Sequence, residues 1–187
     1  MANSKRKDTL VLAFLVLIVA IAGFAGDAVA ATKAEIDAGV RDALKQFHKE
    51  VGVAKELSGK AKGMLVFPSV IKAGIGIGGE YGEGALRIGG KTSGYYSTAA
   101  ASVGFQLGAQ SKTVIILFMT GSALSDFQKS KGWEAGVSGS VALATIGAGG
   151  TIETKTLNQP IIGFVFSNKG LMYNLTLEGS KITRIKK

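Results

Sequence analysis

The sequence predicts an α+β domain in which N-terminal amphipathic helices pack on a strongly curved, mostly antiparallel sheet or partial β-barrel. Helical periodicity of apolar residues occurs just after residue 31, whereas short apolar runs separated by glycine dominate from Met64 onward. Glycine makes up 27 of the 187 residues, about twice its usual share. Helices followed by many short, glycine-punctuated strands are typical of an α+β fold with a bent sheet.

The first helix is expected to begin after Thr32, because Thr32 and Glu35 have the spacing of a capping box. Its apolar residues recur at helical spacing and define one face, namely Ile36, Val40, Leu44, Phe47 and Val51. A second, shorter helical segment is expected from Val53 to Ala61. Charged residues recur every four positions on another stripe, where Asp37 is placed to pair with Lys33 and Arg41.

The remainder is expected to form strands. The predicted strands cover residues 64–67, 74–78, 85–88, 94–98, 103–109, 113–118, 134–142, 150–155, 161–166, 171–177 and 181–185. Pro68 is expected to end the first strand, and a turn is expected over residues 82–84. The alternating glycines at 74, 76 and 78 would let the strand bend sharply or let another backbone approach closely. A helix capped by Thr120 or Ser122 is expected to interrupt the strands.

Residues 1–30 have the pattern of a secretory signal peptide. Lys5, Arg6 and Lys7 precede a sixteen-residue run without charge, which is short for a membrane span. The segment ends in Ala28-Val29-Ala30, which fits a signal-peptidase site after Ala30. We therefore expect export to the periplasm or cell envelope and a single mature domain over residues 31–187. The alternative is an uncleaved N-terminal anchor.

The composition excludes several kinds of chemistry. The chain has no cysteine and one histidine, which excludes disulfides, thiol nucleophiles and multi-histidine metal sites. Gly74–Gly79 spells a dinucleotide fingerprint and Gly90-Lys91-Thr92 resembles the end of a phosphate loop, but neither precedes a helical pattern. We predict no catalytic residues, no cofactor and no metal. The alternative enzyme site would use the close carboxylates Glu80 and Glu83 as an acid/base pair or a cation site. Solvated positions in a hairpin are the more common role of such a pair, and we expect that role here.

The excess of lysine and arginine over acidic residues indicates that the protein binds an anionic surface. The net charge is +9, and an exported basic protein meets lipid head groups rather than chromosomal DNA, so no nucleic-acid partner is expected. The predicted lipid-binding residues are Arg41, Lys45, Lys49, Lys60, Lys62 and Lys72. Trp133, Tyr95 and Tyr96 could serve as interfacial anchors, although packing in the sheet is the more common role of such residues.

Three segments resemble the SYLF domain family. They are KAKGMLVFPSVIKAGIGIGGEYGEG at residues 60–84, GFQLGAQSKTVIILFM at 104–119 and SNKGLMYNLTLEGSKI at 167–182. They occur in the family's order and, with the stretches between them, span most of residues 35–185. The resemblance implies lipid binding, with an amphipathic N-terminal helix involved in membrane contact, and implies an exported envelope protein like the family's bacterial members.

The sequence thus predicts a non-enzymatic, exported domain that binds anionic phospholipids or a membrane surface through basic residues. Partial insertion of the helix after Thr32 would add to this attraction. Packing of that helix on the sheet is nevertheless favoured, because its five apolar residues would be costly to leave in water. The alternative function is an envelope scaffold that binds a protein partner through its sheet edges or its helix.

Overall fold

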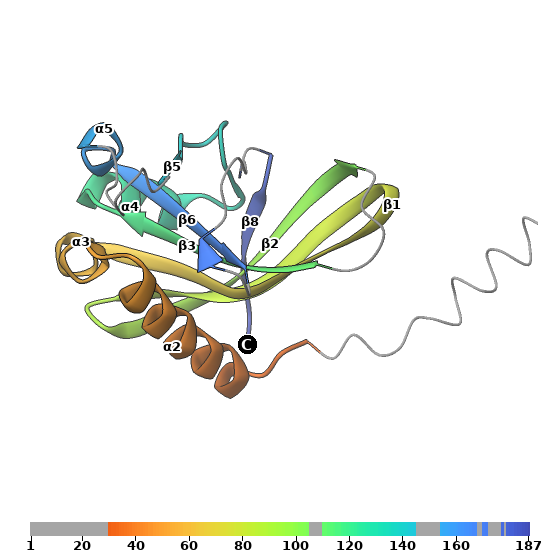
Figure 1. Cartoon of the computed structure of the whole chain (residues 1–187), viewed down its shortest axis with the longest axis horizontal. Helices are drawn as coiled ribbons and strands as arrows, with labels where there is room; N and C mark the ends of the chain where they lie inside the picture. Colours follow the sequence, from red (N-terminus) through yellow and green to blue (C-terminus); the bar gives the residue numbers. More distant parts are fainter. Residues whose placement is uncertain (1–29, 105–109, 145–153, 168–169, 172–176, 178) are drawn as a thin grey trace, which may run out of the picture. The chain divides into compact units, whose positions relative to one another are not determined.

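Figure 1 shows the computed structural model of the chain, which describes residues 30–104, 110–144, 154–167, 170–171, 177 and 179–187. The chain divides into two units, Met1–Ala31 and Thr32–Lys187. All the helices and strands described below belong to the second unit. Within the described residues, no helix is both long enough and apolar enough to cross a bilayer.

The second unit is a mixed α+β domain whose sheet curls into a half-barrel (Figure 1), as predicted. Helices α2 (Lys33–Glu50) and α3 (Ala54–Lys60) precede the sheet, and α4 (Gly121–Lys129) and the short α5 (Thr154–Leu157) interrupt it. The strands are β1 (Gly63–Ile88), β2 (Lys91–Gly104), β3 (Gln110–Phe118), β4 (Trp133–Glu134), β5 (Ala142–Leu143), β6 (Ile161–Ser167), β7 (Gly170–Leu171) and β8 (Lys181–Ile185). Their order is β4-β8-β2-β1-β3-β6-β5, with β7 on β6, and among these described pairings only β5–β6 is parallel.

Strand β1 folds back on itself. A straight strand would place residues 66 and 84 roughly 60 Å apart, yet a Cβ added at Gly84 would clash with the carbonyl oxygen of Val66, and one added at Gly82 would lie 2.7 Å from that of Ser69. Figure 1 shows β1 running to one end of the sheet and returning. The reversal lies in the glycine-rich stretch between Lys72 and Glu80. The Nζ atom of Lys72 lies 3.8 Å from Oε1 of Glu80.

This reversal corrects the predicted turn at residues 82–84. Gly82 and Gly84 belong to the returning half of β1, where the lack of a side chain admits the backbone of the outgoing half. The tight turn instead follows β1, at Gly89 and Gly90, whose φ angles are 56° and 78°. Two consecutive positive φ angles are typical of a two-residue hairpin turn. The rejected phosphate-loop motif is thus the start of β2.

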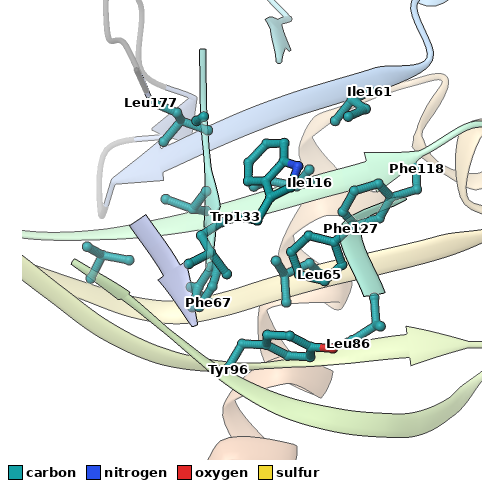
Figure 2. Close-up of a cluster of buried hydrophobic side chains, with 14 of the residues drawn as sticks. Leu65, Phe67, Leu86, Tyr96, Ile116, Phe118, Phe127, Trp133, Ile161 and Leu177 are labelled. Atoms are coloured by element: carbon teal, nitrogen blue, oxygen red, sulfur yellow. The ribbon is translucent and has the colours of Figure 1, made fainter. Parts of the chain in front are cut away.

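Both faces of the central strands are buried, which explains their continuous apolar runs. On β3, alternate side chains point to opposite faces, so Val114 and Ile116 belong to one face and Ile115 and Leu117 to the other. The first of these faces carries the cluster shown in Figure 2, where the rings of Phe127 of α4 and Trp133 of β4 meet the sheet. We call this face the inner face.

Helices α2 and α3 pack against the opposite face, which we call the helix face. The ring of Phe47 lies 4.7 Å from the ring of Phe164, between ring centroids, and has no exposed surface. Near the start of α2, a Cβ added at Gly39 would lie 2.9 Å from the Cβ of Pro68. The capping box of Thr32 and Glu35 is present, as predicted. The favoured expectation that this helix packs on the sheet is therefore confirmed.

Several other strand predictions need correction. Pro68 does not end the first strand, because it lies at an irregularity between Phe67 and Val70 where β1 loses its regular pairing with β3, a position that tolerates proline. Of the strand expected over 134–142, Glu134 belongs to β4 and Ala142 to β5, and residues 135–141 between them form turns and irregular structure. Of the strand expected over 150–155, the described part begins helix α5. Of the one expected over 171–177, only Leu171 lies in a described strand.

The other elements agree with the sequence analysis, apart from stretches outside the described residues. The strands expected at 94–98, 113–118, 161–166 and 181–185 lie within β2, β3, β6 and β8. Thr120 caps α4, and its side chain accepts the amide hydrogen bond of Ala123. Residues 105–109 of the strand expected at 103–109 lie outside the described residues, as do residues 150–153 and 172–176.

Candidate functional site

Helix α2 presents a row of cations to solvent. Arg41, Lys45 and Lys49 are all exposed and lie one helical turn apart, on the side of α2 away from its buried residues. Lys45 forms an exposed ion pair with Asp42 at 3.0 Å, which contributes little to stability. Arg41 and Lys49 have no ion-pair partner among the described residues. The structure thus brings three of the six predicted lipid-binding residues together on one surface.

Asp37 fixes α2 to the sheet. The expected pairing of Asp37 with Lys33 and Arg41 is wrong, because its carboxylate accepts hydrogen bonds from Thr92 at 2.9 Å and from Tyr95 at 3.0 Å. Burial and the hydrogen bond to the Asp37 carboxylate both raise the pKa of Tyr95. The sequence placed Asp37 on the charged stripe but could not show that β2 lies beside it.

The second predicted group, Lys60, Lys62 and Lys72, is divided by the fold. Lys60 and Lys62 are exposed near the end of α3, where Lys60 pairs with Glu56 at 2.6 Å. Lys72 lies ten residues further along the outgoing half of β1, which corresponds to roughly 33 Å of extended strand. Its side chain is only 28% exposed and approaches Glu80 rather than solvent.

The neighbours of Lys62 include two cations that the sequence analysis did not select. A Cβ added at Gly63 would lie 3.6 Å from the carbonyl oxygen of Arg87, and Lys91 pairs with Ile88 across the hairpin. The guanidinium of Arg87 donates a hydrogen bond to the carbonyl of Gly90, whereas its buried Nε has no partner among the described residues. The signal that could have found them is the Gly89-Gly90 turn, which brings the two strand ends together.

Glu80 and Glu83 do not form a carboxylate pair. An odd separation along a regular strand directs two side chains to opposite faces, and Glu80 reaches Lys112 at 2.6 Å whereas Glu83 reaches Lys187 at 2.7 Å. All four side chains are at most 14% exposed. Each carboxylate therefore neutralises a partly buried lysine. The expectation of solvated hairpin residues is wrong, and the geometry gives no support to an acid/base pair.

The inner face contains a small cavity beside Glu80 and Lys112. Its volume of about 10 Å³ is near the lower limit for one water molecule. The hydroxyl-bearing residues Thr98 and Ser180 line it together with apolar side chains. Within the described ranges, no group of three or more acidic or histidine side chains is placed to hold a metal ion.

Two of the three aromatic residues considered as membrane anchors are buried. Trp133 is 3% exposed and Tyr96 is 6% exposed, and both rings pack against Phe127. Tyr95 is half-buried beside Asp37. Packing in the sheet is thus the role of Trp133 and Tyr96, and an anchoring role for these two rings is contradicted.

The described part of the chain combines a half-barrel, a docked helix with an exposed basic row, and two carboxylates paired with lysines. Residues 99–187 match the family model described as Ysc84: Las17-binding protein actin regulator. This match is consistent with the SYLF domain family that the sequence resembles. The match covers the second and third resembling segments and begins after the first. A search of curated proteins found no match.

Proposed function

We propose that this chain is an exported, non-enzymatic protein of the cell envelope that binds membranes bearing anionic, phosphate-containing head groups. The observation that carries the proposal is the division of α2 into two faces. The apolar face is used in packing on the sheet, so the basic row of Arg41, Lys45 and Lys49 is the surface that remains for a partner. The match of residues 99–187 to a family model described as a binding protein supports a binding function.

The attraction is mainly electrostatic. Each lysine or arginine near an anionic surface contributes about 1 kcal/mol at physiological ionic strength, and the contribution decreases as salt screens the charges. With its apolar residues buried, α2 lies on the bilayer surface and does not insert. Lys60 and Lys62 extend the cationic surface at the end of α3.

Charge reversal on α2 tests the proposal. We expect the Arg41→Glu/Lys49→Glu double variant to lose at least about tenfold in affinity for vesicles containing phosphatidylglycerol. The measurement is co-sedimentation with neutral and with anionic vesicles across a salt series. The parent protein is expected to bind the anionic vesicles only, and more weakly as salt increases.

A matched variant separates the position of the charges from their number. Lys129→Glu/Lys131→Glu makes the same change in net charge at two exposed lysines at and just after the end of α4. This variant should keep most of the affinity. Equal losses in the two variants would mean that only net charge matters, and equal binding of the parent to neutral and anionic vesicles would reject head-group recognition.

Protein binding is the second candidate function, and one edge of the sheet favours it. Strand β8 pairs with β2 along Lys181–Ile185, but β4 pairs only with Ile182 and Lys181 on its other side. Within the described residues, Thr183 to Ile185 thus have one unpaired edge, a feature that can accept an extended peptide. The family description names binding of the protein Las17. Capture of an envelope protein without affinity for vesicles would favour this alternative.

A further inference from the structure

Helices α2 and α3 cover only part of the helix face. Beneath them Val66, Ala85 and Phe164 have no exposed surface. Toward the reversal of β1 no helix of the described residues covers this face, and Ile71 and Tyr81 are 52% and 54% exposed. Figure 1 shows this end of β1 and β2 extending beyond the described helices.

Ile71 and Tyr81 lie side by side on this uncovered region. Their chain neighbours are in contact across the fold of β1, since Lys72 approaches Glu80 and a Cβ added at Gly82 would lie 2.9 Å from the Val70 side chain. Val70 and Glu80 both line the inner-face cavity. Ile71 directly follows Val70 and Tyr81 directly follows Glu80 along the strand. Their side chains therefore point to the opposite face, the helix face.

Four small, uncharged residues lie next to this pair on the same face. Tyr81 pairs in register with Ala99 and Gly79 with Ala101, and Ala73 follows two residues after Ile71 on the same strand. All of these residues are exposed. We call the set the distal patch; it consists of Ile71, Ala73, Gly79, Tyr81, Ala99 and Ala101. Absence of charge over six exposed residues is notable in a chain with a net charge of +9.

We propose that the distal patch inserts into the acyl-chain boundary of a lipid bilayer. This inference rests on the proposed membrane function and adds an apolar contact to it. The phenolic hydroxyl of Tyr81 donates to Glu83 at 3.0 Å, so its ring is held at the surface with the polar end toward the protein. Aromatic rings with one polar end favour the lipid–water interface. Lys181, exposed and in register with Ala99, places a cation at the rim.

The small size of the distal patch favours lipid over a second protein. A stable protein interface buries about 800 Å² on each partner, which is much more than two half-exposed large side chains and four alanines or glycines provide. Insertion into a bilayer needs no complementary partner surface, because each buried apolar group is removed from water whatever surrounds it. The basic row on α2 attracts the head groups, and the distal patch adds the burial of apolar groups below them.

The test uses the Ile71→Ser/Tyr81→Ser variant of the full mature domain with vesicles of phosphatidylcholine and phosphatidylglycerol. Its affinity is expected to fall by at least about tenfold, with the thermal midpoint unchanged because both side chains are half-exposed. Val137→Ser is the matched control, since Val137 is 77% exposed and lies outside the distal patch. If the parent binds vesicles in a salt-sensitive way and the double variant binds with the same affinity, insertion of the distal patch is rejected and the membrane function stands. No binding of the parent to vesicles would instead reject the membrane function itself.

Fluorescence quenching provides a second readout. Trp133 is the chain's only tryptophan and is 3% exposed, so brominated acyl chains should not quench the parent protein. In Tyr81→Trp, the same lipids should quench the new indole. A vesicle-bound Tyr81→Trp protein that is not quenched would contradict insertion. A second result would also contradict insertion. If the parent protein were a dimer, and Ile71→Ser/Tyr81→Ser converted it to a monomer without changing its vesicle affinity, the distal patch would be a contact between two copies of the chain.

Discussion

Replacing Gly84 with alanine is expected to prevent the domain from folding. The new methyl group would overlap the carbonyl oxygen of Val66 and crowd the ring of Phe67. The clashing oxygen belongs to the backbone of a paired strand. Val66 therefore cannot move aside without breaking its pairing with Ile115. We expect a loss of more than about 4 kcal/mol in the free energy of unfolding, comparable to the whole stability of many small domains.

Urea denaturation followed by circular dichroism checks this expectation. Two glycine variants serve as controls for the loss of backbone freedom. In Gly79→Ala the methyl group would lie 3.7 Å from the carbonyl oxygen of Ala100, an ordinary contact, and in Gly59→Ala no atom lies within 4 Å. The second variant should be slightly more stable, because alanine favours the helical state of α3 over glycine. A Gly84→Ala protein as stable as Gly79→Ala would show that β1 does not fold back as described.

Replacing Phe47 with alanine is expected to cost about 3–5 kcal/mol and to loosen α2 from the sheet. The Phe47 ring is fully buried and contacts the rings of Phe164 and Phe166 of β6. Its removal leaves a cavity on the helix face that the two remaining rings cannot fill. The urea midpoint should fall strongly, and the amide protons of α2 should exchange faster than those of β3.

Leu44→Ala is the matched control for this second variant, because Leu44 lies on the same helix and is only half-buried. Its loss in the free energy of unfolding should be clearly smaller. A similar small loss in both variants would mean that α2 is not anchored through Phe47.

The sequence predicted the helices well because their signals are local. The capping box of Thr32 and Glu35 and the spacing of Ile36, Val40 and Phe47 require no knowledge of the sheet, and the structure confirms them. Strands with buried residues on both faces, such as β3 and β6, were also found from their apolar runs.

The course of β1 could not be predicted, because it depends on contacts between residues far apart in the chain. Glycines at 74, 76 and 78 correctly indicated a bend, but the turn was placed at Gly82 and Gly84, whose role is to admit the outgoing half of the strand. For the same reason Lys72 was grouped with Lys60 and Lys62, although the fold directs it toward Glu80. Only the row on α2 follows directly from helical periodicity.

The central claim is that α2 stays on the sheet and meets its partner through its exposed basic row. The alternative is a helix that leaves the sheet and inserts its apolar face. The two arrangements place Ile36, Val40 and Phe47 in different surroundings, protein interior in the first and lipid in the second. A covalent link between α2 and β1 separates them.

The most direct test is vesicle binding by a Gly39→Cys/Pro68→Cys protein in its oxidised and reduced forms. A Cβ at position 39 lies 2.9 Å from that of Pro68, within about 1 Å of the usual disulfide separation, and the chain has no other cysteine. We predict that the oxidised and reduced forms bind anionic vesicles with equal affinity. Loss of binding on oxidation, restored by reduction, would show that α2 must leave the sheet and would contradict the account.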